Sequence, residues 1–175
     1  QLSETDTLLS SRMGREYILQ TALLNARSHF DVIIIDCPPN LGNLTINALV
    51  AADHVLVPCD MSILAFEGVA DLLGAVSTVN MRLRQSLNIL GILRTRVDGR
   101  TRQINDAIGN ALEDNYGQLL LETSIPINSA LAKAQAAGLS IFQFDARSRG
   151  AVAYSALATE VITRLAQSQN AVLAS

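Results

Sequence analysis

The stretch that most constrains the fold runs from Phe30 to Gly42, with the sequence FDVIIIDCPPNLG. Val32–Ile35 is an unbroken run of β-branched apolar residues, which is typical of a strand covered on both faces in a parallel α/β sheet. The chain must leave the sheet soon after Asp36, because Pro38 and Pro39 cannot donate to a sheet ladder. The pattern therefore predicts a buried strand with a carboxylate at its carboxyl end, where open α/β sheets gather ligands.

Two interpretations of Asp36 follow from this position. Four apolar residues followed by Asp is the pattern with which a Walker-B element holds Mg²⁺ near nucleotide phosphates. Alternatively, Asp36 is a strand-end residue that caps the following turn. The spacing alone leaves both interpretations open.

Composition places the 175-residue chain among compact globular proteins. Hydrophobic residues make up 49% and charged residues 17%, which predicts one domain over residues 1–175 with a sizeable core. No apolar run approaches the roughly 20 residues of a membrane span. The net charge of −3 argues against a generally basic surface for nucleic acid. Cys37 and Cys59 lack zinc-site spacing, and we expect both to be buried thiols in a reducing cytoplasm.

Strand and helix patterns alternate along the chain. Apolar runs predict strands at residues 32–35, 55–58, 87–93 and 119–125, of which the second and the fourth stop at prolines. Helical spacing predicts helices at residues 14–28, 44–52, 62–80, 102–115, 128–137 and 148–167. Ser62 and Thr101 are expected N-caps, and Gly138 is an expected helix-ending residue. The alternation predicts a doubly wound, mostly parallel α/β sheet.

Several longer sequence segments, in the order in which they occur here, resemble the ParA/Soj family of partition ATPases, which are related to the MinD-type deviant-Walker ATPases. These segments are FDVIIIDCPPNLGNLTINALVAADHVLVPCD, AFEGVADLL, GILRTRVDGRT, TSIPIN and LSIFQFDARSRGAVAYSALATEVI. The resemblance implies a P-loop NTPase-like fold, ATP and Mg²⁺ as cofactors, and an ATP-dependent homodimer that a ParB-like partner stimulates. It also implies a cytoplasmic protein that associates with the nucleoid while it moves DNA or another cargo.

The family's phosphate loop has no counterpart in this sequence. A phosphate cradle needs glycines, whose backbone N–H groups point inward, and a lysine on the β- and γ-phosphates. The pattern Gly-x-x-x-x-Gly-Lys-Ser/Thr is absent, and Lys133 is the only lysine. The family's water-positioning Asp loop is also absent, so we assign no catalytic residue and expect no ATP hydrolysis by these residues alone.

Loss of the phosphate-loop strand has a structural consequence as well. In this family that strand lies beside the Walker-B strand, so its absence would leave Val32–Ile35 with unpaired backbone groups. We therefore expect the chain to be the C-terminal two-thirds of a longer ParA-like ATPase. A natural short paralogue that fills the gap by dimerising is the alternative.

The resemblance assigns roles to individual residues. Asp36 corresponds to the metal-side acid, and the segment after it corresponds to a switch, with Pro38, Pro39, Gly42 and Asn43. Thr95 and Arg96 follow an expected strand where the family places adenine contacts, and Pro126 with Asn128 match its second adenine-side loop. The alternative roles are turn formation for the switch residues and strand termination for Pro126. Asn47 is expected to be a structural amide.

DNA binding is expected to be weaker than in the family pattern. That pattern carries arginines where this chain has Ile127 and Ala130, and neutral side chains cannot release counterions from phosphate. A substitute patch could use Arg94, Arg100 and Arg102, or Arg147 and Arg149, although such arginines commonly form a solvated surface. The tail after Arg164 has no lysine or arginine, which disfavours a basic membrane helix.

Three hypotheses follow. The first is a ParA-like ATPase for plasmid or chromosome partition or for cargo positioning. The second is a degenerate, non-catalytic module that keeps the fold and a dimer surface. The third is a MinD-type ATPase that cycles on a membrane.

Overall fold

A computed structural model of the protein describes residues 13–83, 85–98 and 102–173. The described residues form two compact units. Unit 1 contains the residues up to Val55 together with Ala70–Asn88, and unit 2 contains Leu56–Val69 together with the residues from Ile89 onward. Each unit is described by itself below, and the expectation of one domain stays a prediction.

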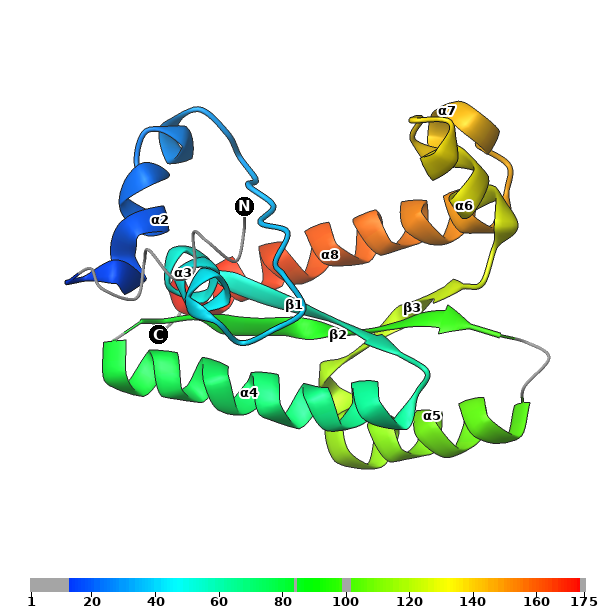
Figure 1. Ribbon diagram of the computed structural model, residues 1–175, viewed down its shortest axis with the longest axis horizontal. Helices are drawn as coiled ribbons and strands as arrows, with labels where there is room; N and C mark the ends of the chain where they lie inside the picture. The colour runs from blue at the N-terminus through cyan, green and yellow to red at the C-terminus, as the bar shows by residue number, and fades with distance from the viewer. Residues whose placement is uncertain (1–12, 84, 99–101, 174–175) are drawn as a thin grey trace. The chain divides into compact units, whose positions relative to one another are not determined.

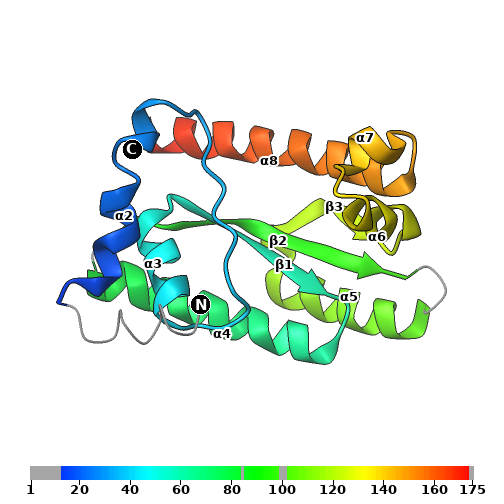
Figure 2. The same cartoon turned by 45° about the horizontal axis from the view of Figure 1, so that its top comes forward.

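Unit 2 is built on a three-stranded sheet with the strand order β1-β2-β3. The strands are β1 (His54–Asp60), β2 (Asn88–Val97) and β3 (Leu120–Pro126). The strand β2 pairs in parallel with β3, and the arrows of β1 and β2 point the same way in Figures 1 and 2. Helix α8 (Arg149–Leu173) lies over one face and α5 (Arg102–Tyr116) over the other. This arrangement confirms the predicted parallel α/β class.

The core of unit 2 joins α8 to the sheet. Leu93, Leu121, Ile125 and Leu157 are buried and pack together, and Val161 packs against them. On α8, Leu157 is buried, whereas Val152 is 61% exposed. Val152 lies in the first turn of α8, before the helix reaches the cluster of Leu93, Leu121 and Ile125.

The segment after β3 carries two short helices whose ends are well defined. Helix α6 (Ser129–Ala136) begins at Asn128, whose side chain accepts a hydrogen bond from the backbone of Ala130. It ends at Gly138, which has φ +65° as predicted for a helix-ending glycine. The short apolar segment that follows is helix α7 (Ile141–Asp145), which opens with a capping box of Ser140 and Gln143.

Unit 1 contains helical segments η1 (Arg15–Tyr17), α2 (Ile18–Ala22), η2 (Ala26–Ser28) and α3 (Asn43–Ala51). The expected single helix over residues 14–28 is therefore wrong, whereas α3 confirms the helix predicted at 44–52. The expected apolar face has no continuous partner, because Leu24 stays 65% exposed. Instead, polar groups tie this segment to α3: Gln20 donates to the Val50 carbonyl, and Arg27 donates to the Ala51 carbonyl.

The predicted strand Val32–Ile35 does not form. The segment is coil in Figures 1 and 2, with Val32 58% and Ile34 90% exposed. An isolated apolar run cannot form a strand, because strand stability comes from ladder hydrogen bonds and cross-strand contacts with a neighbour. Among the described residues no strand pairs with this run, and this agrees with the expectation that loss of the phosphate-loop strand leaves it unpaired.

Two strand ends also differ from prediction. β1 continues past Pro58 to Asp60, which an edge strand tolerates because the missing N–H can face away from the ladder. β2 continues to Val97 and so includes Arg94, which lies beyond the strand predicted at residues 87–93.

Helix α4 (Ile63–Leu83) contributes residues to both units. Ser62 caps it as predicted, since its hydroxyl accepts a hydrogen bond from the Ala65 backbone at 3.3 Å. An 18-residue window has a mean hydropathy of 1.3, so among the described helices α4 alone meets the length and composition of a membrane span. The expected absence of a span rested on unbroken apolar runs, which Glu67 and Asp71 interrupt here. Core helices of soluble proteins also satisfy these two criteria.

Candidate functional site

The carboxyl ends of the strands in unit 2 bring the predicted adenine-side residues together. Val97 near the end of β2 lies opposite Pro126 at the end of β3, and the Ile127 N–H donates to the Val97 carbonyl at 3.0 Å. The pair Thr95 and Arg96 is thereby joined to the segment Pro126–Asn128. We call this the carboxyl edge, and it is the position where parallel sheets gather ligands.

Thr95 and Arg96 lie within the end of β2, not after it as expected, and they form a bulge. From Arg94 to Val97 the strand advances three residues, while its partner advances two, from Ser124 to Pro126. Arg96 accommodates this extra residue, because its backbone adopts the left-handed region at φ +53°. That conformation costs an L-residue about 1–2 kcal/mol. Bulges near sheet ends re-aim side chains and are frequent beside active sites.

An ion pair crosses this edge from β1 to β2. The Nε atom of Arg96 lies 3.7 Å from Oδ2 of Asp60, with side-chain exposures of 74% and 40%. Asp60 was not among the sequence candidates. The strand predicted at residues 55–58 ended two residues before Asp60, whereas β1 extends to it.

Asn128 and Pro126 both have structural tasks at this edge. The Asn128 Oδ1 atom accepts a hydrogen bond of 2.8 Å from the Ala130 N–H and so caps α6. Pro126 is the last residue of β3, in line with the alternative role of strand terminator. In Asn128 the amide NH₂ makes no hydrogen bond to the described residues, so the side chain can cap the helix and still present donors.

In unit 1, Asp36 and the switch segment precede α3. The hydroxyl of Thr45 donates to the carbonyls of Pro38 and Asn40, which folds the segment back over the first turn of α3. Gly42 is the N-cap residue of α3 in an extended conformation, and Asn43 is its first helical residue. Asn47 is a buried amide that accepts from the Leu19 N–H and donates to the Asn43 carbonyl, which confirms its structural role.

The carboxylate of Asp36 is exposed and belongs to no group of three or more His, Cys, Asp or Glu among the described residues. One carboxylate fits a Mg²⁺ site that is completed by water and phosphate oxygens, but it does not form an all-protein site. Asp36 therefore has the chemistry of one metal ligand in such a site, and the sequence contains no glycine-rich loop that would cradle the phosphates.

The two thiols lie in different surroundings. Cys59 is fully buried, as expected, but Cys37 is exposed. This corrects the expectation for Cys37, which was tied to a buried strand that does not form. Partial burial and the neighbouring Asp36 carboxylate raise the pKa of Cys37, and burial followed by the Asp60 carboxylate raises the pKa of Cys59.

Of the arginines predicted to contact DNA, Arg94 is directed to the sheet. Its Nη2 atom donates to the Leu121 carbonyl at 3.2 Å, and its Nε atom is buried without a hydrogen-bond partner among the described residues. Arg102 is the first residue of α5, and Arg100 lies outside the described residues. Arg147 and Arg149 are exposed at the start of α8.

Arg94 belongs to a polar network that supplies hydrogen-bond partners to the backbone of an irregular stretch of β3. Between Ile92 and Arg94 of β2, the partner strand advances from Leu120 to Ser124. Glu160 of α8 accepts from two backbone N–H groups there, each at 2.9 Å. Arg164 pairs with Glu160 at 3.1 Å and donates to the Leu120 carbonyl. Burial raises the pKa of Glu160, but the backbone hydrogen bonds and Arg164 outweigh it and hold the pKa below its usual value.

A pocket of about 260 Å³ in unit 1 is separate from these candidates. Gln20, Arg27, Val50 and Asp53 are among the residues that line it. The Gln20 amide donates to the Val50 carbonyl, and Arg27 binds the Ala51 carbonyl and Asp53. The polar groups that line this pocket thus help to pack α2 against α3.

Comparisons with known proteins agree with this architecture. A family model described as an AAA domain matches residues 1–89. The sporulation initiation inhibitor protein Soj of Bacillus subtilis is 40% identical over 161 residues, covering 92% of this chain and 63% of that protein. The chromosome partitioning protein ParA of Myxococcus xanthus is 34% identical over 163 residues, covering 93% and 57%.

A solved structure is also similar. Cobyrinic acid a,c-diamide synthase from Mycobacterium smegmatis, solved with a bound ATP analog and magnesium, is 37% identical with a TM-score of 0.71, covering 87% of this chain and 56% of that one. This chain thus spans less than two thirds of the length of the proteins it matches. The parallel sheet, the carboxyl edge and these similarities lead to one conclusion: the chain belongs to the ParA/Soj family of partition ATPases.

Proposed function

We propose that this chain supplies the metal side and the base side of the ATP site in a ParA-like ATPase that partitions DNA or positions another cargo. The observation that carries the proposal is the carboxyl edge, where the ends of β2 and β3 join Thr95 and Arg96 to Pro126 and Asn128 through the Ile127–Val97 hydrogen bond. These two segments, which are about 30 residues apart in sequence, would together supply one surface for a base.

Individual residues of the chain would have separate roles in binding the nucleotide. The exposed carboxylate of Asp36 would hold Mg²⁺, largely through water. The bulge of β2 would orient Thr95 and Arg96 toward the base, and the free NH₂ of Asn128 would donate to it. Bound Mg²⁺ neutralises charge on the phosphates. The phosphates themselves need a cradle that this sequence does not contain, so we infer that the chain is the C-terminal two-thirds of a longer protein.

In that longer protein ATP would drive homodimerisation, and a ParB-like partner would stimulate hydrolysis in the cytoplasm or on the nucleoid. Support comes from the similarity to Soj and ParA. DNA contact would be weak and salt-dependent, since Ile127 and Ala130 are neutral and Arg94 binds the sheet.

The test replaces Asp36 with Ala in the longer protein. We expect loss of Mg-ATP-dependent dimerisation, measured by size-exclusion chromatography with light scattering, and loss of phosphate release. Asp31→Ala, which removes an exposed acid from the same segment, is the matched control and should change neither. If Asp36→Ala dimerises and turns over ATP normally, the metal role of Asp36 is wrong.

The rival functions give different outcomes in the same experiment. A non-catalytic module would release no phosphate in any variant while it keeps its fold. A membrane-cycling ATPase would sediment with anionic liposomes in the presence of ATP. The proposed function predicts turnover without liposome association.

A further inference from the structure

A net displacement of one residue separates the two ends of the ladder between β2 and β3. Ile92 of β2 lies opposite Leu120 of β3, and a regular parallel ladder would continue from there to place Val97 opposite Ile125. Val97 lies opposite Pro126 instead. A displacement of one residue moves a strand by ~3.3 Å and exchanges the faces on which its side chains lie. The irregularities within the ladder therefore decide how the segment after β3 meets the end of β2.

The side chain of Glu160 on α8 binds a backbone geometry that a regular strand does not offer. Its Oε1 atom accepts from the Glu122 N–H and its Oε2 atom accepts from the Thr123 N–H, each at 2.9 Å. Successive residues of a regular strand face opposite ways, so their N–H groups point to opposite edges. One carboxylate can accept from both only where the strand is irregular. In a regular ladder Glu160 would lose at least one of these two hydrogen bonds.

Arg164 holds the Glu160 carboxylate in this position. Its Nη2 atom lies 3.1 Å from Oε1 of Glu160, and the two side chains are 23% and 16% exposed. The same guanidinium donates to the carbonyl of Leu90 in β2 and to the carbonyl of Leu120 in β3. It thus bridges the two strands before the irregular stretch begins. A largely buried pair in which both partners also bind the backbone is directional, whereas an exposed ion pair is not.

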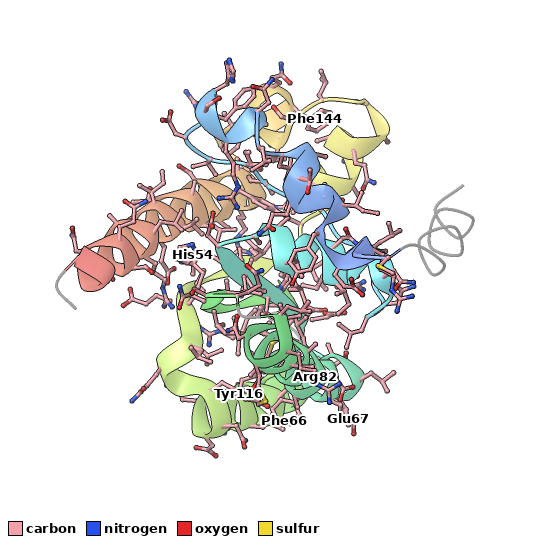
Figure 3. The ribbon with its side chains drawn as sticks, turned by 90° about the vertical axis from the view of Figure 1, so that its left-hand side faces the viewer. His54, Phe66, Glu67, Arg82, Tyr116 and Phe144 are labelled. Carbon is pink, nitrogen blue, oxygen red and sulfur yellow. The ribbon has the colours of Figure 1, made fainter. Side chains whose placement is uncertain are left out.

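The apolar contacts of unit 2 do not have this directionality. Leu121 and Ile125, which flank the irregular stretch, are both buried in the cluster beneath α8. Helices α4 and α5 meet through the rings of Phe66 and Tyr116, whose centroids are 6.1 Å apart (Figure 3). Burial of apolar surface is non-directional, so it does not by itself distinguish one strand register from another. The hydrogen bonds of Glu160 do distinguish them.

We propose that Glu160 is a positioning residue: by holding the irregular stretch of β3, it fixes where the segment Pro126–Asn128 meets the end of β2. The hydrogen bond from the Ile127 N–H to the Val97 carbonyl, at 3.0 Å, reports this register. Helix α8 thereby acts on the carboxyl edge through the backbone of β3. The effect on the register stands by itself, whereas its consequence for nucleotide binding rests on the proposed function.

Amide hydrogen exchange of the 175-residue chain, followed by NMR, tests the register directly. Glu160→Gln keeps the shape of the side chain but leaves one oxygen to accept. It should accelerate exchange of the Ile127 amide about tenfold relative to the amide of Leu112, a fully buried residue of α5. Glu122→Gln neutralises an exposed carboxylate in the same stretch and is the matched control, which should change neither amide. Loss of global stability alone would accelerate both amides equally, and that result would overturn the positioning role.

A second variant keeps the test decisive if Glu160→Gln does not fold. Arg94→Met removes the hydrogen bond that the Arg94 Nη2 atom donates to the Leu121 carbonyl in the same stretch. It should accelerate exchange of the Ile127 amide about threefold relative to Leu112, because a single bond to the irregular stretch is lost. An Ile127 amide that does not respond would overturn the inference.

The consequence for the nucleotide is measured in the longer protein by isothermal titration calorimetry. Glu160→Gln should weaken ATP binding about threefold, as for a residue that acts through others. It should leave the binding of inorganic tripolyphosphate unchanged, because the displaced segment belongs to the base side. Equal weakening of both ligands would overturn the link to the base side. If the unchanged protein binds no ATP, the proposed function fails, whereas the exchange of the Ile127 amide still decides whether Glu160 fixes the register.

Discussion

At the scale of single residues, half-buried charged side chains on α8 and β2 hydrogen-bond to backbone groups of β3 that have no partner within the sheet. The irregular stretch of β3 leaves backbone N–H and C=O groups without ladder partners. Glu160 takes two of the N–H groups, and Arg164 and Arg94 each take one carbonyl. Buried backbone groups must be paired, so these three charged side chains belong to the fold.

Replacing Glu160 with Ala should therefore lower the free energy of unfolding by roughly 1–3 kcal/mol at pH 7, because two backbone donors and Arg164 lose their partner. Urea unfolding followed by circular dichroism measures it. Glu122→Ala is the control, because the exposed Glu122 side chain lies on the same strand but only its backbone N–H joins the network. Equal losses in the two variants would contradict the assignment.

The same carboxylate predicts a dependence on pH. Since the folded pKa of Glu160 is lowered, its stabilisation is fully present above the unfolded pKa of about 4.3 and is lost as pH falls through the lower folded value. The difference in unfolding free energy between the unchanged chain and Glu160→Ala should thus be constant from pH 7 to 6 and should shrink below pH 4. A difference that grows in acid would reverse the sign of the shift.

The two cysteines should differ in reactivity. Cys37 is exposed and Cys59 is fully buried, so iodoacetamide should modify one thiol in the native chain and two after unfolding. Because the Asp36 carboxylate helps to raise the pKa of Cys37, Asp36→Asn should increase the thiolate fraction and the labelling rate at pH 8. Cys37→Ser identifies the labelled site. Rapid native labelling that survives Cys37→Ser would contradict this assignment.

At the scale of elements, helix ends in the segment after β3 are set by local chemistry. Asn128 starts α6, Gly138 ends it at positive φ, and Ser140 with Gln143 start α7. These residues are preferred at such positions because they satisfy end groups that a helix leaves unpaired.

Substitutions of Asn128 can distinguish its role as a helix cap from its proposed contact with the base. Asn128→Ala should reduce the free energy of unfolding by about 1 kcal/mol, as for loss of an N-cap, whereas Asn128→Asp should retain most of it. If the NH₂ also contacts the base, Asn128→Asp should keep the stability but weaken ATP binding in the longer protein. Thermal unfolding and calorimetry measure the two effects, and an equally stable Asn128→Ala would exclude the cap.

At the scale of the whole molecule, the accuracy of sequence-based prediction depended on whether the information is local. The helix over 44–52, Ser62 as a cap and Gly138 follow from neighbours in sequence and are confirmed. The pairing of Val97 with Pro126 at the ends of β2 and β3 follows from parallel topology. By contrast, the bulge at Arg96 and its pair with Asp60 arise from register across strands, for which the sequence carries no local signal.

The Val32–Ile35 segment is the clearest case of a non-local requirement. Its apolar, β-branched composition is right for a buried strand, yet the described chain offers it no neighbour and it remains coil. Composition specifies what an element could become, while pairing decides whether it forms. The same reasoning applies to residues 14–28, whose helical spacing lacks a continuous partner face.

Hydrogen exchange can test this dependence on a neighbouring strand. In the 175-residue chain, the amides of residues 32–35 should exchange at nearly unprotected rates, because no described strand accepts from them, while those of β3 should be protected. In a longer protein with the phosphate-loop strand, the amides of residues 32–35 should gain protection, and β3 should change little. Mass spectrometry of peptic peptides compares the two. Strong protection of residues 32–35 in the shorter chain would mean that this segment finds a partner without that strand, which would remove the structural reason for a longer protein.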